Sequence, residues 1–136
     1  FTVSQDTEAF YGGASSAKIM LMTEKTAELA QSWYMPVTAG TNYTLSVWAW
    51  ENDPNLRARL VLEFFDGTQK VDAGENVSKY SDYTTDNAEW QAMSVTITAP
   101  EGATQLRGFI RFYDQNDFDP AVGAAMHIDD WSVSMN

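Results

Sequence analysis

The sequence has no cysteine, a single histidine (His127) and few basic residues. Without cysteine the chain can form neither a disulfide framework nor a thiolate metal site. One histidine excludes a metal site built from several histidines, and the nucleophile pattern G-x-S-x-G is absent. With 19 acidic and 8 basic residues the net charge is −11, which argues against nucleic acid or an anionic membrane surface as a partner. No hydrophobic run approaches membrane-spanning length.

The chain is long enough to bury a substantial core. Its 136 residues predict one domain, residues 1–136. Hydrophobic residues make up 44% and aromatic residues 13% of the sequence, which argues against disorder. Because the sequence begins at Phe1 rather than Met, we expect a processed or excised piece. The expected location is secreted and extracellular.

Apolar residues alternate with polar ones, and helical periodicity is almost absent. Turn signals rich in Gly, Pro, Asn and Asp separate the alternating segments. The expected strands are residues 16–22, 43–50, 57–66, 90–98, 105–114 and 126–135. Residues 51–55, 71–87 and 115–123 are expected to be mainly loops, and residues 23–29 to be a loop or the entry to a strand. Short strands at this spacing predict an all-β sandwich or barrel.

Four motifs occur in an order that resembles a known family. They are GGASSAKI at 12–19, VTAGT followed by YTLS at 37–46, Trp90 followed by a strand that ends in APEGA at 99–103, and IDDWSV at 128–133. Together they resemble the β-jelly-roll carbohydrate-binding modules of the group that includes families 4, 9, 16 and 22. The resemblance covers nearly the whole chain, and it implies a β-sandwich (jelly roll) of two antiparallel sheets that binds polysaccharide. The family usually opens with a further strand, which we expect to be missing here or supplied by another segment.

The strand from Tyr43 to Trp50 has an unusual second face. One face carries apolar residues from Tyr43 to Ala49, whereas Trp48 and Trp50 share the other with small hydroxyl residues. Such a face is either buried by a second sheet or exposed as an aromatic platform.

The same period of two places all four arginines on the outer faces of two other strands, residues 57–65 and 105–114. If these strands share a sheet with Trp48, they form one surface, which we call the predicted platform. It consists of Trp48, Trp50, Arg57, Arg59, Glu63, Arg111 and Tyr113, with Phe109 beside them.

Aromatic rings and arginines together suit a sugar. A pyranose stacks its C–H face on an aromatic ring, and a planar guanidinium binds vicinal hydroxyls or a carboxylate. The predicted ligand is a β-linked polysaccharide, neutral or mildly acidic. In the alternative, Arg59 or Arg111 pairs with Glu63 and the tryptophans pack under loops.

The remaining aromatic residues have simpler interpretations. Trp33, Trp90 and Trp131 are expected in the core. Tyr80 and Tyr83 lie in a polar segment, where they either rim the groove or cap the edge of the core.

Asp129 is the candidate metal ligand. A simple period of two places it on the same face as Trp131 and Val133, towards the core, where a carboxylate needs a partner. The family resemblance implies structural calcium, bound by Asp129 and by backbone carbonyls around Ser16 to Lys18. In the alternative, Asp129 caps backbone amides. A second acidic cluster, at residues 114–119, does not match EF-hand spacing and is expected to be a solvated loop.

Nothing in the sequence requires catalysis. Two carboxylates would suffice for a glycosidase, and Glu63 on the predicted platform is the one candidate acid. We therefore expect a non-catalytic module that holds an attached catalytic domain near its polysaccharide. The alternative is a structural or adhesion domain that packs on a neighbouring domain or protein and binds no sugar.

Overall fold

The computed structural model describes residues 1–23, 26–74 and 78–136, and within them ten strands and no helix are found. The predicted all-β class is therefore confirmed. Residues 24–25 and 75–77, which belong to two of the predicted loops, lie outside the described residues. No helix in the described part of the chain is long and apolar enough to cross a membrane.

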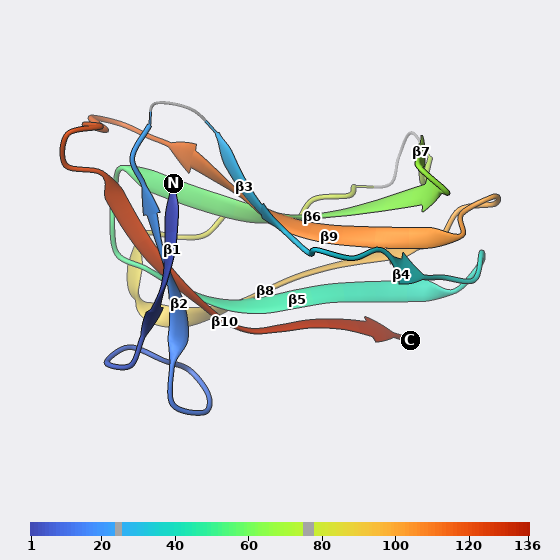
Figure 1. Ribbon diagram of the computed structural model, residues 1–136, viewed down its shortest axis with the longest axis horizontal. Helices are drawn as coiled ribbons and strands as arrows, with labels where there is room; N and C mark the ends of the chain where they lie inside the picture. Colours follow the sequence, from blue (N-terminus) through green and yellow to red (C-terminus); the bar gives the residue numbers. More distant parts are fainter. Residues whose placement is uncertain (24–25, 75–77) are drawn as a thin grey trace.

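The strands form two antiparallel sheets that lie as two layers (Figure 1). Sheet A has the order β1 (Thr2–Asp6), β2 (Ser16–Leu21), β10 (Ala124–Met135), β5 (Asn42–Glu51) and β8 (Asn87–Thr98). Sheet B has the order β3 (Ala27–Ala30), β9 (Gln105–Asp114), β6 (Leu56–Asp66) and β7 (Gln69–Val71), and β4 (Met35–Pro36) also pairs with β9. The prediction of a sandwich of two antiparallel sheets is confirmed.

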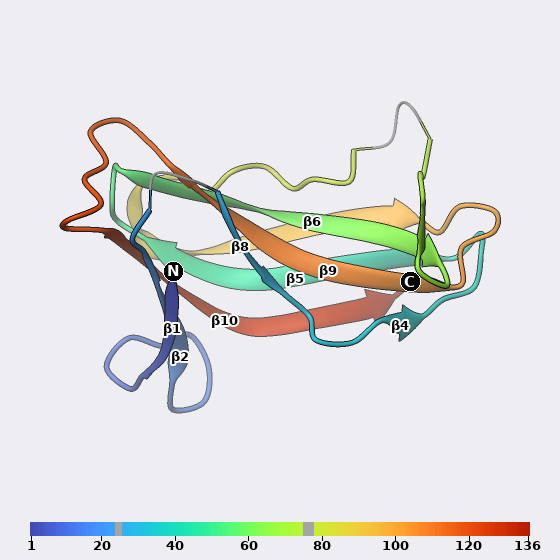
Figure 2. The same ribbon diagram turned by 45° about the horizontal axis from the view of Figure 1, so that its top comes forward.

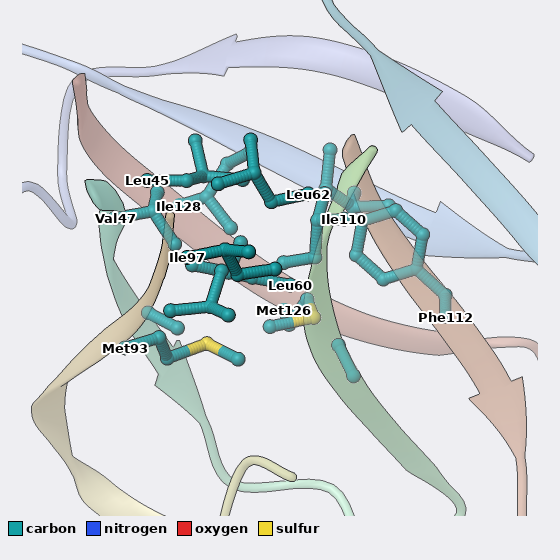
Figure 3. Packing of buried hydrophobic residues seen from close by; sticks show 14 of the residues in the cluster. Leu45, Val47, Leu60, Leu62, Met93, Ile97, Ile110, Phe112, Met126 and Ile128 are labelled. Atoms are coloured by element: carbon teal, nitrogen blue, oxygen red, sulfur yellow. The ribbon is translucent and has the colours of Figure 1, made fainter. Parts of the chain in front are cut away.

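The core lies between the two sheets (Figure 3). Sheet A contributes alternate residues of β5, β8 and β10, such as Leu45, Ile97 and Ile128, and sheet B contributes those of β6 and β9, such as Leu60 and Ile110. All five are at most 6% exposed. Burial of each such side chain stabilises the fold by roughly 1.5–3 kcal/mol, so the period of two decides which residues remain for the outer faces.

An irregular segment extends sheet B beside β6. Leu62 N donates to Lys79 O, Ser81 N to Leu60 O and Thr84 N to Ala58 O, at 2.8–3.0 Å. A single β-bridge joins Val61 to Tyr80. This pairing places Tyr80 on the same side of the sheet as Val61, which is the outer side.

The first strand, β1, is not evident from sequence. Four of its five residues are exposed, and it is the edge strand of sheet A, paired only with β2 in the described structure. Backbone pairing with β2 therefore forms the strand, because its side chains contribute little burial.

The predicted inward orientation of Asp129 is wrong. Strand β10 has a β-bulge between Asp129 and Ser132, and Asp130 has a φ of 51°. Asp129 pairs with Trp48 and therefore lies on the outer face of sheet A, whereas Trp131 packs on the core. The extra residue of the bulge breaks the period of two on which the prediction rested.

Two of the three predicted core tryptophans lie elsewhere. Trp33 is 61% exposed in the connection between β3 and β4. Trp90 is half-buried, and it pairs with Trp50 on the outer face of sheet A. Only the prediction for Trp131 is confirmed. Alternation identified the strand that contains Trp90, but it could not show which face the second sheet covers.

Glu51 is fully buried at the end of β5. Its Oε1 accepts a hydrogen bond from Asp53 N, whereas Oε2 has no partner among the described residues. Burial, together with the nearby charges of Asp86 and Asp53, raises the pKa of Glu51 to about 6 against the opposing hydrogen bond from Asp53. The folded protein therefore holds this proton more tightly than the unfolded chain does.

We expect Glu51→Gln to stabilise the protein at pH 7 to 8 by about 1 to 2 kcal/mol. The folded pKa of about 6 lies above the ordinary value of 4.5. The free energy of unfolding therefore falls as the pH rises from 4.5 to about 6, and it stays reduced at higher pH. Glutamine mimics the protonated side chain, so the gain should vanish below pH 4.5. Thermal unfolding from pH 4 to 8 measures both effects, and an equal gain at every pH would contradict this account.

Candidate functional site

The predicted platform does not form one surface. Strand β5, with Trp48 and Trp50, belongs to sheet A, whereas β6 and β9, with the arginines, belong to sheet B. The assumption that the three strands share a sheet is therefore wrong. Strands β5 and β6 are consecutive in sequence, but their connection crosses from one layer to the other, so their outer faces point in opposite directions (Figure 1).

On sheet B, arginines and tyrosines gather on the outer face. We call Arg57, Arg59, Tyr80, Tyr83 and Tyr113 the arginine–tyrosine face. The Cζ of Arg57 lies 3.8 Å from the ring centroid of Tyr83, and that of Arg59 lies 3.8 Å from the centroid of Tyr80. Arg59 Nε also donates to the Tyr113 hydroxyl at 3.1 Å. These cation–π contacts hold both guanidinium groups over aromatic rings.

The two arginines of this face have no ion-pair partner among the described residues. By contrast, Arg111 forms an ion pair with Glu28 at 2.7 Å. The buried Nε of Arg57 has no hydrogen-bond partner in the described structure. Two unneutralised guanidinium groups are unusual in a protein with a net charge of −11. They leave donors available for a ligand that has hydroxyl or carboxylate oxygens.

Glu63, at the other end of β6, is occupied by lysines. Its Oε1 accepts from Lys70 Nζ at 2.9 Å and from Lys79 Nζ at 3.2 Å. Burial raises the pKa of Glu63, but the hydrogen bonds from Lys70 and Lys79 outweigh it and lower the pKa below its ordinary value. Neither Arg59 nor Arg111 pairs with Glu63, so this part of the alternative arrangement is not observed. An ionised carboxylate held in this way has no proton to donate as a general acid.

On sheet A, the tryptophans contact other aromatic residues. The Tyr11 ring stacks on Trp48 with centroids 3.9 Å apart and an angle of 15°, and it lies 6.0 Å from Trp90. Trp50 meets the ring of His127 edge to face at 5.7 Å. One face of Trp48 is therefore covered by a loop residue, as in the alternative in which the tryptophans pack under loops. Sequence reasoning missed Tyr11, because its only local signal is the following Gly-Gly turn.

Asp129 positions this loop. Its Oδ2 accepts from the amides of Tyr11 at 2.8 Å and Gly12 at 2.9 Å, and its Oδ1 accepts from Asp130 N at 2.8 Å. Burial raises the pKa of Asp129, but the hydrogen bonds from these amides outweigh it and lower the pKa. This is the amide cap that the sequence left open as the alternative to calcium.

The predicted calcium ligands make other contacts in this structure. Lys18 pairs with β1 on one side and β10 on the other, so its carbonyl is directed into the sheet. Among the described strands, Ser16 pairs with β1 only. No group of three or more acidic, histidine or cysteine side chains that could hold a metal occurs in the described part of the chain. The amides around Asp129 present N–H groups, whereas calcium requires oxygen ligands. Calcium binding stays an untested prediction, and the hydrogen bonds favour the amide cap.

We expect the thermal unfolding midpoint to be the same in calcium and in EDTA. Asp129→Asn should destabilise the protein by about 1 kcal/mol, because an amide cannot accept from all three N–H groups as well as a carboxylate does. Asp117→Asn, in an exposed loop, is the matched control and should have little effect. A calcium-dependent rise in the midpoint that Asp129→Asn abolishes would support the metal site instead.

Comparison with known proteins supports the fold assignment. No model of a protein family matches the chain, and no curated protein does. Solved structures do match. The enzymatically active domain of tailspike protein 4 from bacteriophage CBA120 has 14% identity and a TM-score of 0.73, covering 99% of this chain and 18% of that one. A family 16 carbohydrate-binding module has 17% identity and a TM-score of 0.62, covering 97% and 84%.

A third match is the family 22 module with the catalytic module of xylanase 10B from Clostridium thermocellum, solved with xylohexaose. It has 15% identity and a TM-score of 0.65, and it covers 97% of this chain and 24% of that one. The chain thus spans less than a quarter of the tailspike and xylanase chains, but most of the isolated family 16 module. These matches confirm the resemblance to carbohydrate-binding-module jelly rolls at the level of the fold.

Proposed function

We propose that this chain is a non-catalytic polysaccharide-binding module and that its ligand lies on the arginine–tyrosine face of sheet B. The observation that carries the proposal is the pair Arg57 and Arg59, stacked on tyrosine rings and free of ion-pair partners among the described residues. The similarity in fold to carbohydrate-binding modules supports it.

The ligand that suits this face is a β-linked polysaccharide, neutral or mildly acidic. The rings of Tyr80, Tyr83 and Tyr113 can pack against sugar C–H groups, and the arginine N–H groups can bind hydroxyls or a uronic carboxylate. Holding the guanidinium groups in place before binding lowers the entropy cost of ordering them. Trp48 and Trp50 lie on the opposite side of the sandwich and are not part of this ligand site.

The proposed role is to keep an attached catalytic domain close to its substrate outside the cell. Glu63, the one candidate acid, is paired with two lysines and keeps a lowered pKa. The xylanase match combines a module of this fold with a catalytic module in one chain. This is the arrangement proposed for the parent protein of the present chain.

We expect Arg59→Ala to weaken polysaccharide retention in affinity gel electrophoresis by about tenfold or more, a loss typical of a central binding residue. Arg59→Lys should recover only part of it, because lysine lacks the planar guanidinium group. Gels with neutral and with acidic polysaccharide measure the effect, and comparison between them shows whether charge contributes.

The matched control is Trp48→Ala, on the opposite face, which should leave retention unchanged. Loss of retention in Trp48→Ala but not in Arg59→Ala would move the ligand site to sheet A. No retention of the unmodified chain by any gel would favour the structural or adhesion domain that binds no sugar.

A further inference from the structure

A separate hollow opens at the edge of the sandwich, away from the arginine–tyrosine face. Its lining residues come from β3, from the connection between β3 and β4, and from β10. Figure 2 shows the course of these segments. Its volume is about 300 Å³, at the lower end of the range for small-molecule clefts. Its lining residues are Leu29, Ala30, Gln31, Ser32, Trp33, Ile128 and Trp131.

The backbone at this edge has a defined conformation. Gln31 N donates to Gly108 O at 3.0 Å, and Gly108 N donates to Gln31 Oε1 at 2.8 Å. A Cβ on Gly108 would lie only 2.7 Å from both Gln31 Oε1 and Leu45 Cδ2. Glycine thus lets the Gln31 side chain enter the strand pairing, and this fixes the start of the segment that carries Trp33.

Two tryptophans line the hollow, and one lacks a partner for its N–H group. Trp33 is 61% exposed, the largest exposed fraction of any aromatic side chain among the described residues. Trp131 is packed on the core, and its buried Nε1 has no hydrogen-bond partner in the described structure. Because this nitrogen is buried, Trp131 offers a ligand in the hollow its ring rather than its N–H group.

The lining also selects the charge of the ligand. None of the seven lining residues is charged, although the chain has a net charge of −11. The polar side-chain groups that remain are the indole N–H of the exposed Trp33, the hydroxyl of Ser32 and the amide nitrogen of Gln31, whose oxygen is already bonded to Gly108. A charged ligand would find no counter-charge here, whereas a neutral ligand with hydroxyl groups could hydrogen-bond to these polar groups.

We propose that this hollow, between Trp33 and Trp131, is a second carbohydrate site that binds one or two neutral sugar residues. The C–H face of the sugar packs on the indole rings, and its hydroxyls hydrogen-bond to the Ser32 hydroxyl, the Gln31 amide nitrogen and the Trp33 N–H. Its small volume suits a chain end or a short branch rather than a long internal stretch. The ligand class rests on the proposed function, whereas the site is independent of the arginine–tyrosine face.

Two sites on one module change how it binds a polysaccharide. Once one site holds the glycan, the second binds at a raised local concentration, so overall retention exceeds that of either site alone. This gain requires a glycan that can reach from the outer face of sheet B to its β3 edge.

The test follows the indole N–H signals of the five tryptophans by NMR during titration with xylohexaose, β-1,4-galactotriose and a galacturonate trimer. We expect a neutral oligosaccharide to shift the assigned Trp131 signal in the unmodified chain and equally in Arg59→Ala. Trp33→Ala should weaken this binding by about tenfold or more, and Trp33→Phe should retain much of it. Unchanged thermal midpoints establish that both variants fold.

Three results would overturn the second site: no shift of Trp131 with either neutral probe, an undiminished shift in Trp33→Ala, or a shift with galacturonate alone. A Trp131 signal that instead moves with protein concentration, together with dimers in sedimentation, would assign the hollow to contacts between copies of the chain. If polysaccharide retention depends on Arg59 but the NMR signal of Trp131 does not shift, the second site is rejected and the proposed function is still supported. If no polysaccharide retains the chain and no oligosaccharide shifts the Trp131 signal, both the proposed function and the second site are rejected.

Discussion

The packing of the two apolar sheet faces against each other is the constraint on which the rest of this structure depends. Each long strand directs alternate residues into the layer seen in Figure 3, so the residues between them must point outwards. Because the layers are opposed, the outward residues of β5 and those of β6 and β9 end on opposite sides of the molecule. Two surfaces with different chemistry result from a single core.

The two surfaces use their aromatic residues differently. On sheet A the ring of Tyr11 covers Trp48, and the cap at Asp129 holds the Tyr11 loop in place. On sheet B the tyrosine rings support arginines, and the polar edges of Arg57 and Arg59 remain without carboxylate partners in the described structure. Aromatic content alone therefore does not identify a binding surface, because what covers each ring decides whether a ligand can reach it.

Irregular positions supply much of the chemistry at the edges. The bulge after Asp129 turns this carboxylate outwards, towards the amides of Tyr11 and Gly12. Gly108 in β9 leaves room for the side chain of Gln31 to hydrogen-bond to the strand backbone. Trp33, two residues further along the connection from β3 to β4, is then exposed. Both devices interrupt a regular ladder, and both place a polar or aromatic group where a regular strand would not.

By itself, the sequence determined the fold class, most of the strands and, for β5, β6, β8 and β9, the face that enters the core. These follow from alternation and turn residues, which are local and survive in any pairing. It also identified Arg57, Arg59 and Tyr113 as outward residues. Tertiary structure alone decided that Trp48 and Trp50 lie on the other sheet, that Trp33 is exposed and that Asp129 caps amides. These outcomes depend on strand partners, a bulge and contacts between residues up to 118 positions apart. None of these features produces a periodic pattern of residues in the sequence.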